Sequence, residues 1–309
     1  MMNHGPGIML TFSNIADLMR RIGLPGPLHP LIALVNYDTT TPDLSDAGKW
    51  FLLDFYKISF KSTFNGSVKY GPGTYDFKEG GLAFLEPNQL VEMTANPADY
   101  QGYVLYFHPD LLLNYPLAHH INKYGFFSYA VTEALFLSEI EKAIITSLFQ
   151  AITFELNNNM DQFSQDVFVS QLSLLLDHSN RFYNRQFLTR KPINNELITG
   201  MYNYLAAWTN EGNGLLKGTP SAQDIASNLN VTQRYLSDML KSMTGKTTQQ
   251  HIHLQLIEKA KELLTNSTLT TAEIAYRLGF EHPQSFNKLF KQKTNTSPAL
   301  FRQSKQYNS

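Results

Sequence analysis

The feature that most constrains the fold of this chain is an internal repeat in its last third. Ser221–Val231 and Thr270–Phe280 align without a gap, 49 residues apart. Each copy begins with a hydroxyl residue that is followed three positions later by a carboxylate, Asp224 or Glu273. This is the pattern of a capping box, in which the two side chains satisfy free N–H groups at the start of a helix. Two copies with the same caps and spacing predict two copies of one helical unit.

The end of each copy carries the residues that a tight turn between helices needs. Gly279 and Asn230 stand at equivalent positions, and glycine and asparagine are the residues that best tolerate left-handed backbone conformation. Ala226 and Ala275 fall where the two helices of a helix-turn-helix cross closely, and their small side chains permit that approach. The repeat therefore predicts two helix-turn-helix units.

The second helix of each unit also repeats, now at an offset of 50 residues because the second turn has gained one residue. The equivalent pairs are Leu236 with Phe286, Leu240 with Phe290, Lys241 with Lys291, and Gly245 with Asn295. Between the units, residues 248–264 carry apolar side chains at helical spacing, namely Ile252, Leu256, Ala260, Leu263 and Leu264. We expect this connecting helix to pack against both units and to fix their separation.

Charge is distributed unevenly along the chain, although the net charge is only −1. Residues 200–309 contain 12 Lys and Arg against 7 Asp and Glu, a net charge of +5, which leaves −6 for the first 199 residues. The basic C-terminal part suits a polyanion such as nucleic acid, but an excess of this size is also common on solvated surfaces. The motifs, and not the charge, carry the prediction.

The chain from residue 31 to residue 108 reads as β structure. Short apolar or alternating runs cover Leu31–Tyr37, Trp50–Phe60, Leu82–Leu85 and Tyr103–Phe107. Turn formers separate these runs, namely Asn65-Gly66, Gly71-Pro72-Gly73, Glu79-Gly80-Gly81, Pro87-Asn88 and Asn96-Pro97. This rhythm predicts an antiparallel sandwich or barrel.

Helical spacing begins after Ser138. One apolar stripe runs through Ile140, Ile144, Ile145, Leu148, Ile152 and Leu156, and another through Val167, Leu172, Leu175, Leu176 and Phe182. Leu188–Asn195 shows no such periodicity and contains Pro192, so we place a linker there. Apolar residues at helical spacing from Leu197 to Trp208 then predict an amphipathic helix that ends near Gly212.

The composition excludes several classes of protein. The chain has no cysteine, which rules out disulfide frameworks, thiolate metal sites and thiol nucleophiles. No 18 apolar residues follow one another and no N-terminal segment reads as a secretion signal, so neither membrane insertion nor export is expected. We therefore expect a cytoplasmic protein.

Three motifs in the last third resemble the AraC/XylS family of transcription regulators. They are Glu273–Phe280, Ser285–Lys291 and Ser297–Arg302, and the resemblance extends over about residues 196–304. The chain departs from the family pattern in four places, where Leu256 replaces the usual Arg, Asn295 the usual Gly, Ser285 a common aromatic residue and Asp238 an often basic one. These departures concern phosphate contacts and base preference rather than the fold.

The resemblance implies a sequence-specific DNA-binding regulator whose two recognition helices enter successive major grooves, about 34 Å apart. Carried over position by position, it assigns base contacts to Gln233, Arg234, Ser237 and Asp238 in the first helix, and to Gln284, Ser285, Asn287 and Lys288 in the second. It assigns phosphate contacts to Lys241, Lys291 and Lys246, and helix closure to Gly245, Pro298 and Arg302. Any one of these polar residues is also compatible with an ordinary solvated helix position.

The β region, with its glycine-rich turns over Tyr75–Gln89, resembles the cupin-type barrel that many members of this family carry ahead of the DNA-binding part. That resemblance implies a barrel that binds a small effector, followed by helices near residues 139–185 that form a homodimer. The aromatic residues that would line an effector pocket are Phe55, Tyr56, Tyr70, Tyr75 and Tyr106, with Tyr103 and Phe107 beside them. Aromatic residues that alternate along strands nevertheless belong more often to a core. The stripe Leu148, Ile152 and Leu156 is expected either on its own sheet or across the dimer.

The expected fold is thus α+β. Residues 1–190 form a cupin-like antiparallel β-barrel with two following helices, and residues 191–309 form an all-α DNA-binding domain with two helix-turn-helix units. The expected partners are double-stranded DNA, a small-molecule effector, a second copy of the chain and, if the protein is an activator, RNA polymerase. The sequence identifies neither the effector nor the operator.

Two other functions stay open. A metal-dependent cupin enzyme with a DNA-binding tail needs a His-x-His pair near a carboxylate, but the barrel segment contains only His108, with His29 before it and His119-His120 after it. His251 and His253 lie in an expected helix, where residues i and i+2 face different sides, so we expect a surface role for them. No Gly-x-Ser-x-Gly motif is present, and we expect no enzyme, catalytic residue, metal or cofactor. The other function is a ligand-binding module without specific DNA recognition.

Overall fold

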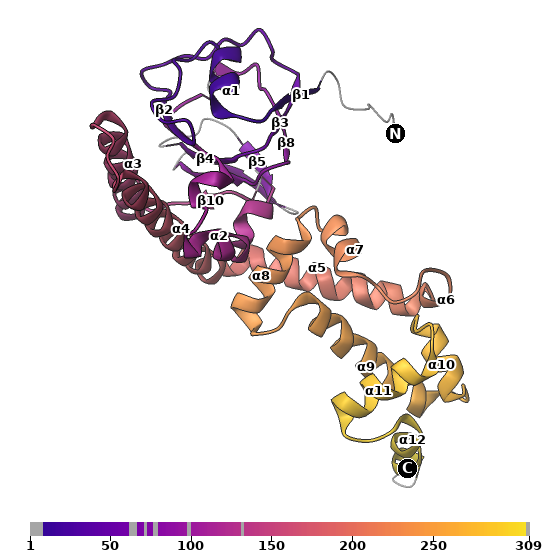
Figure 1. The fold of residues 1–309 in the computed structure, drawn as a ribbon. Coiled ribbons are helices and arrows are strands. Elements are labelled where there is room, and N and C mark those ends of the chain that lie inside the picture. The colour runs from indigo at the N-terminus through magenta and orange to yellow at the C-terminus, as the bar shows by residue number, and fades with distance from the viewer. Residues whose placement is uncertain are drawn as a thin grey trace. The chain divides into compact units, whose positions relative to one another are not determined.

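The structure is a computed structural model that describes residues 9–61, 67–70, 73–76, 80–97, 100–130 and 133–306. The chain divides into two compact units (Figure 1). The first, here called the sheet unit, comprises Met1–Tyr70 and Thr74–Gln186. The second, here called the helical unit, comprises Phe187–Ser309 with Gly71–Gly73. The mixed α+β class predicted from the sequence is confirmed.

The sheet unit is built on a five-stranded antiparallel sheet in the order β10-β7-β4-β9-β2. Its strands are β2 (Ile32–Asn36), β4 (Tyr56–Lys61), β7 (Gly81–Leu85), β9 (Tyr103–Phe107) and β10 (Leu135–Phe136). A second sheet has the order β1-β3-β8, with β1 (Met9–Phe12), β3 (Trp50–Leu53) and β8 (Leu90–Glu92). A two-stranded sheet joins β5 (Ser67–Tyr70) to β6 (Gly73–Asp76).

Two details of this sheet unit differ from the expectation. The run Trp50–Phe60 is not one strand but two, because the chain bends at Asp54 and passes from the three-stranded sheet to the five-stranded one. The backbone N–H of Asp54 donates to the carbonyl of Phe12, which holds the bend against β1. The pairing of β1 with β3 is also parallel, whereas we expected antiparallel strands throughout.

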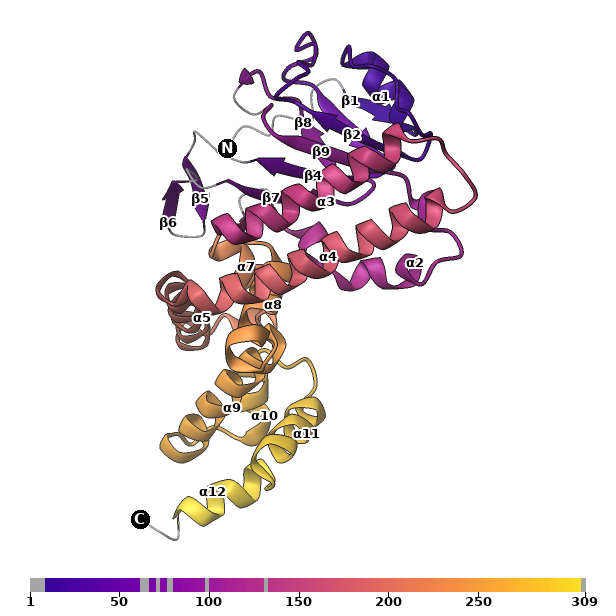
Figure 2. The same ribbon diagram turned by 90° about the vertical axis from the view of Figure 1, so that its left-hand side faces the viewer.

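Helix α3 (Glu139–Asn157) and helix α4 (Ser164–Thr189) follow the strands, and α3 runs across one face of the five-stranded sheet (Figure 2). The helix begins with a capping box between Ser138 and Glu141. The Phe149 ring stacks on Phe60 of β4 and Tyr103 of β9, at centroid distances of 5.7 and 5.5 Å. These contacts anchor α3 on its own sheet.

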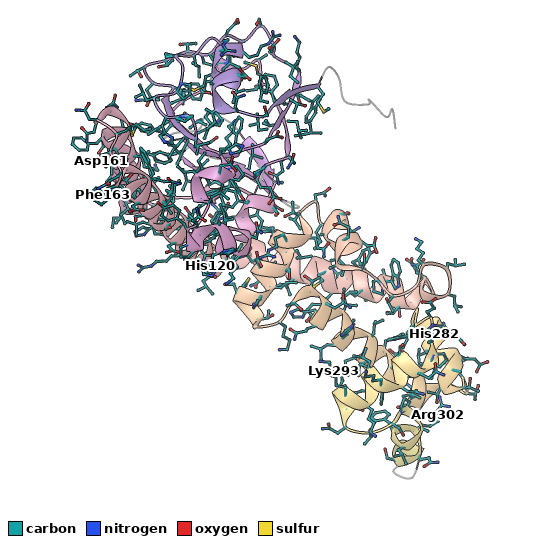
Figure 3. The ribbon with its side chains drawn as sticks, viewed as in Figure 1. His120, Asp161, Phe163, His282, Lys293 and Arg302 are labelled. Carbon is teal, nitrogen blue, oxygen red and sulfur yellow. The ribbon has the colours of Figure 1, made fainter. Side chains whose placement is uncertain are left out.

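The apolar stripe of α3 is therefore not a dimer surface. Leu148, Ile152 and Leu156 are all buried within the single chain. The interpretation of this stripe as a contact across a dimer is wrong, because the flat aromatic face of the sheet offers the apolar area that the stripe needs. Other apolar side chains of this region, Ile140, Phe154 and Phe163, stay exposed, and Figure 3 labels Phe163.

Smaller elements complete the sheet unit. They are α1 (Ile15–Arg21), η2 (Pro109–Leu112), α2 (Pro116–His120), η3 (Ile121–Lys123) and η4 (Gly125–Ser128). Helix α1 is capped by Asn14, and its Ile15, Leu18 and Met19 join a buried cluster with residues of β3 and β9.

The prediction of a structureless linker over Leu188–Asn195 is wrong. Helix α4 runs to Thr189 and helix α5 begins at Lys191. Pro192 lies in the first turn of α5, where a proline is tolerated because N–H groups in that turn have no intrahelical acceptor. The proline therefore marks the start of a helix rather than a gap between domains.

The helical unit contains α5 (Lys191–Asn210), α6 (Gly214–Lys217), α7 (Ala222–Asn228), α8 (Gln233–Thr244), α9 (Thr248–Asn266), α10 (Thr271–Arg277), α11 (Pro283–Thr294) and α12 (Pro298–Gln306). Helix α9 contacts α7 and α8 on one side and α10 and α11 on the other. The expected helix between the repeats is thus confirmed. Within the described ranges, no helix is both long and apolar enough to cross a membrane.

Candidate nucleic-acid interface and ligand cavity

Both copies of the sequence repeat form the capping boxes that their residues predict. The Ser221 hydroxyl accepts a hydrogen bond from the backbone N–H of Asp224 at 3.1 Å, and the Asp224 carboxylate accepts in return from the backbone N–H of Ser221. In the second copy the backbone N–H and the hydroxyl of Thr270 both donate to Glu273. These hydrogen bonds hold the pKa of the Glu273 carboxyl below its usual range. Helices α7 and α10 therefore start in the same way.

The two turns also match. Asn230 and Gly279 adopt positive φ angles of 56° and 88°. After each of them the chain closes with an equivalent backbone hydrogen bond of 3.0 Å, from Val231 to Ala226 in the first unit and from Phe280 to Ala275 in the second. The predicted left-handed turns are confirmed at both sites.

A second constraint, which the sequence did not reveal, also requires glycine at position 279. A Cβ atom at this position would lie 2.2 Å from the carbonyl oxygen of Gly218, in the segment that follows α6. Gly214 makes a similar close approach, since its Cβ would lie 2.3 Å from the carbonyl oxygen of Arg277. The α6 segment therefore packs directly on the turn of the second helix-turn-helix.

The second helices of the two units bury the apolar residues that the repeat predicts. Leu236 and Leu240 of α8 and Phe286 and Phe290 of α11 have no exposed surface. Each helix ends at a left-handed C-cap, with a φ of 72° at Gly245 in α8 and of 61° at Asn295 in α11. The replacement of glycine by Asn295 therefore leaves the helix end unchanged.

The opposite faces of α8 and α11 carry the residues expected to contact DNA. On α8 these are Gln233, Arg234 and Lys241, which are exposed, and Ser237 and Asp238, which are half-buried. On α11 they are Gln284, Ser285, Asn287, Lys288 and Lys291, all exposed. Each set lies on the side of its helix away from the buried pair, so each helix presents one polar face to solvent.

An ion pair on α8 distinguishes the two faces. The Nε of Arg234 donates to the carboxylate of Asp238 at 3.0 Å. The equivalent positions on α11 are Gln284 and Lys288, which carry no acid. Sequence reasoning treated Arg234 and Asp238 as independent base contacts, although their i, i+4 spacing is the signal for such a pair.

Arg302 has the structural role that was expected of it. Its guanidinium donates to the carbonyl oxygens of Leu264 and Leu269, at 3.0 and 2.6 Å. These carbonyls lie at the end of α9 and just before α10, so Arg302 of α12 ties three helices together (Figure 3 labels Arg302).

His251 is not the surface residue that we expected. It is 4% exposed, and its two ring nitrogens are 2.9 Å from the Tyr202 hydroxyl and the Thr244 hydroxyl. Burial, with the nearby Lys246, lowers the pKa of His251, so the neutral ring links α5, α8 and α9. His253 contacts a different residue, Gln249. Among the described residues, no three His, Cys, Asp or Glu side chains gather to hold a metal ion.

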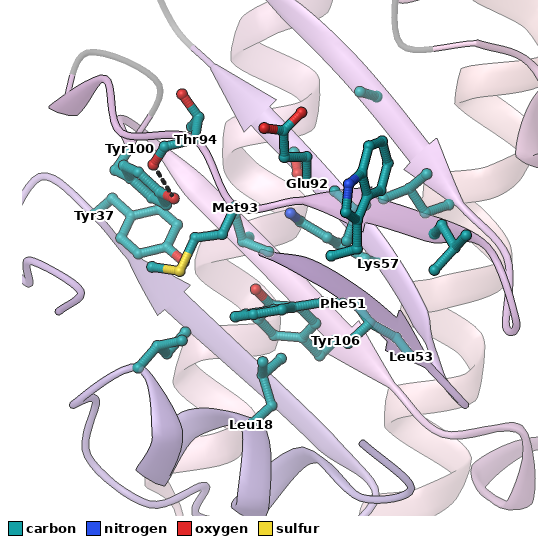
Figure 4. A pocket seen from close by; sticks show the side chains of 18 of the residues that line it. Leu18, Tyr37, Phe51, Leu53, Lys57, Glu92, Met93, Thr94, Tyr100 and Tyr106 are labelled. Atoms are coloured by element: carbon teal, nitrogen blue, oxygen red, sulfur yellow. Dashed lines mark hydrogen bonds between the residues drawn. The ribbon is translucent and has the colours of Figure 1, made fainter. Parts of the chain in front are cut away.

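A cavity of about 500 Å³ lies in the sheet unit (Figure 4). Successive side chains of a strand face opposite sides, so alternation decides which residues line it. The central strands contribute Lys57, Ser59, Lys61, Ala83, Leu85, Val104 and Tyr106. The other side of the same strands presents Tyr56, Ile58, Phe60, Leu82, Phe84, Leu105 and Phe107, which are buried. One face is thus core, and the other is open to a ligand.

The second sheet and the loops close the cavity opposite the central strands. Trp50, Phe51, Leu53, Val91 and Met93 supply apolar walls, and Tyr37, Glu92, Thr94 and Tyr100 supply polar groups. The Tyr100 hydroxyl donates to the carbonyl of Thr94 at 3.0 Å, which fixes one corner. Burial raises the pKa of both Tyr37 and Tyr106.

Lys57 is the cationic residue that sequence reasoning missed. It lies in the middle of β4, paired with Leu85 on one side and Tyr106 on the other. Burial, together with the neighbouring Lys61, lowers the pKa of Lys57 to about 8. The alternation of apolar and polar residues in β4 could have indicated an inward lysine, because Tyr56 and Phe60 flank it on the opposite face.

The five aromatic residues proposed for an effector pocket lie in different places. Tyr106 lines the cavity, whereas Phe55 is fully buried beside it with its ring 5.8 Å from that of Tyr106. Tyr56 faces the other side of the sheet and stacks on Phe107 at 4.7 Å. The side chains of Tyr70 and Tyr75 lie outside the described residues.

Two protein families match separate parts of the chain. Residues 225–304 match the family described as a helix-turn-helix domain, and residues 65–170 match the AraC-like ligand binding domain. A curated relative, the HTH-type transcriptional activator RhaS of Escherichia coli, is 35% identical over 79 residues. That alignment covers 26% of this chain and 28% of RhaS, so the chain spans little more than a quarter of the relative's length.

Solved structures match about a third of the chain. The C-terminal domain of AraT, a response regulator from Geobacillus stearothermophilus, is 26% identical, with a TM-score of 0.31, and the match covers 35% of this chain and 84% of that one. An AraC-type regulator from Chromobacterium violaceum is 20% identical, with a TM-score of 0.32 and coverages of 36% and 93%. The chain thus carries a part that matches the AraC-like ligand binding domain ahead of a part that matches a helix-turn-helix domain, the order that its resemblance to the AraC/XylS family of transcription regulators implies.

Proposed function

We propose that this protein is a sequence-specific DNA-binding transcription regulator in which α8 and α11 read two successive major grooves. The observation that carries the proposal is the pair of matched helix-turn-helix units packed on the common helix α9. Each unit buries an apolar pair and presents a polar face with Arg, Lys, Gln or Asn, the side chains that hydrogen-bond base edges.

Of the ten residues of those polar faces, we assign eight to base contacts and the other two, Lys241 and Lys291, to phosphate contacts. Lys288→Ala is expected to cost about 1–3 kcal/mol on the cognate site and to relax base preference locally, whereas Lys291→Ala weakens binding to all sequences alike. Lys261→Ala on α9 serves as the control of equal charge, since Lys261 pairs with Glu258 outside both faces.

The test is selection of random DNA by the full-length protein at a stated salt concentration. We expect a two-part motif whose parts are separated by about one helical turn, or roughly 10 base pairs. If the folded protein enriched no sequence over random competitor, the proposal would be overturned. A ligand-binding module would then be the remaining function. Circular dichroism of the same preparation establishes folding.

The cavity of the sheet unit is the proposed effector site, because it is a space of ligand size whose wall includes residues 83–106, within the range that matches the ligand binding domain. We also propose that the protein works in the cytoplasm as a homodimer and, like the activator RhaS by its name, activates transcription. An activator of this kind would contact RNA polymerase. The exposed apolar residues Ile140 and Phe154 on α3 support a dimer surface other than the buried stripe. Sedimentation of Phe154→Ser against the unchanged protein tests it, and a monomer in both would overturn the dimer.

A further inference from the structure

The cavity of the sheet unit contains a positive charge that the described residues leave uncompensated. Lys57 belongs to a central strand with neighbours on both sides, so its side chain has no route to the protein surface except through the cavity. Lysine is rarely placed in such a position unless a partner of opposite charge is present. Figure 4 shows Lys57 and Tyr106 pointing into the cavity from neighbouring strands.

No partner for Lys57 is found among the described residues. It forms no ion pair or hydrogen bond with them, whereas four other lysines, Lys49, Lys142, Lys259 and Lys261, pair with carboxylates. Glu92 is the one carboxylate among the described residues that line the cavity, but it is exposed and makes no ion pair with Lys57. Lys61, two residues along the same strand, brings a second positive charge to the same wall. Lys57 is therefore a cation in the cavity wall that the described residues leave without a counter-charge.

Most of the remaining wall is apolar. Phe51, Leu53, Leu85, Val91 and Val104 surround the space, and Trp50 lies on its edge. A volume of about 500 Å³ falls in the range of sites that enclose a drug-sized molecule. A neutral sugar would leave the ammonium uncompensated and would bury hydroxyl groups against these walls. A phosphate ester would bring two charges and more acceptor oxygens than the described donors of this wall match.

We propose that this cavity binds a monoanionic carboxylate with an apolar or aromatic body, the carboxylate pairing with Lys57 and the body lying against Phe51, Leu53 and Val104. This proposal rests on the proposed function in one respect, namely that the bound molecule is taken to be the effector. Tyr106, the cross-strand partner of Lys57 on β9, lines the same wall of the cavity. The carboxylate of the ligand supplies the negative charge for Lys57 that Glu92 does not supply.

The test uses full-length protein and matched pairs of probes, 3-phenylpropionate against 3-phenylpropanol and decanoate against decanol. Isothermal titration gives the affinity, and the fluorescence of Trp50 reports occupancy of the cavity. A Trp208→Phe background removes the signal of the second of the two tryptophans. We expect one carboxylate of the two pairs to bind at least about tenfold more tightly than its alcohol, which is about 1.4 kcal/mol.

Two variants of Lys57 assign this preference to its charge. Lys57→Met keeps the apolar stem and is expected to abolish the preference for carboxylate over alcohol, whereas Lys57→Arg retains it. Lys123→Met, an exposed lysine of η3, is the control and leaves the preference unchanged. Equal binding of acid and alcohol, an undiminished preference in Lys57→Met, or no binding of either acid would each overturn the proposal.

DNA selection separates this proposal from the proposed function. If the carboxylates fail to bind but the two-part DNA motif is recovered, only the ligand class is wrong. If they bind and no DNA motif is recovered, the cavity assignment holds and the regulator assignment fails. An aldehyde probe tests imine formation, because borohydride reduces an imine on Lys57 to a stable amine. Trapping of the aldehyde on Lys57, together with no binding of the acid, would overturn the ion pair in favour of imine formation.

Discussion

At the scale of single residues, the chain uses charged side chains in two different ways. Arg234 is held by Asp238 on the surface of α8, where such a pair contributes only about 0.3–0.5 kcal/mol to the helix. We expect its effect on nucleic-acid binding to be larger, because the pair would withdraw a guanidinium from bases and phosphates and add a negative charge. Lys57 is the opposite case, a charge kept inside the fold at a cost in stability.

Asp238→Asn is expected to strengthen binding to random DNA, because it removes a negative charge from the α8 face and releases Arg234. The slope of log K against log salt should become steeper by about one contact, or about 0.9. Salt titrations of fluorescence anisotropy on random duplex measure this slope. Glu262→Gln, an exposed acid on α9, is the matched control and should change the slope less; equal slopes for all three proteins would refute the ion pair as an influence on DNA.

Lys57→Met is expected to stabilise the ligand-free protein at pH 7. The pKa of Lys57 is lowered to about 8 in the fold, with Lys61 on β4, Glu92 on β8 and Tyr106 on β9 around it. Between this value and the ordinary lysine pKa, the unfolded chain binds the extra proton, so the unchanged protein gains stability as pH rises from 8 towards 10.

Urea unfolding at pH 7 and at pH 9.5 tests this sign. The advantage of Lys57→Met over the unchanged protein should shrink at the higher pH, since the lysine is then mostly neutral in the fold. Lys123→Met should show no such pH dependence. If the stability advantage of Lys57→Met grew with pH, burial would not disfavour the charged form of Lys57.

At the scale of elements, the helix-turn-helix units show how local signals and packing combine. The caps of α7 and α10 follow from residues three positions apart, and the turns follow from residues that tolerate positive φ. The close approach of the α6 segment to Gly279 does not, because the contact partner Gly218 is 61 positions away and belongs to no local motif. Packing thus adds a second constraint at a position that the turn alone already restricts.

Gly279→Ala and Gly245→Ala form a matched pair that separates these constraints. Both residues have positive φ, but a Cβ at Gly245 meets nothing within 4 Å, whereas one at Gly279 meets the Gly218 backbone at 2.2 Å. We expect about 1–2 kcal/mol of destabilisation at Gly245, from conformation alone, and clearly more at Gly279. Thermal unfolding compares the two, and equal losses would show that the α6 segment yields without cost.

At the scale of the whole molecule, the two faces proposed to read DNA belong to one chain, and α8 and α11 both pack on α9. A helix cannot stretch as a flexible linker does, so the separation of the two faces should be almost fixed. The operator is therefore expected to tolerate no change in the spacing of its two parts. This distinguishes a double helix-turn-helix unit from two recognition domains joined by a loop.

Operators with inserted base pairs test this rigidity. Insertion of 5 base pairs between the two parts of the selected motif should reduce affinity to that of a single part, because one face then points away from the groove. Insertion of a full turn, about 10 base pairs, should not restore it, since α9 cannot lengthen. Restored affinity at the full turn would show that the two units move independently.

The sequence by itself determined the helical part of this protein. Its caps, turns and buried pairs are set by contacts between residues three or four positions apart, and repetition of the pattern made each copy evidence for the other. Arg302 was also foreseen as a structural residue, and the hydrogen bonds to Leu264 and Leu269 bear this out. The runs at β2, β7 and β9 could be found as well, because period-two alternation and turn residues are local signals.

Only the tertiary structure decided which side of each strand faces the cavity and which faces α3. Alternation along β4 separates Tyr56 and Phe60 from Lys57 but does not say which set lies under a helix, because that depends on strands far away in the sequence. The same limit applied to the stripe of α3, to the buried ring of His251 and to the helix start at Pro192. In each case the observed conformation is stabilised by contacts with residues that lie far away in the sequence.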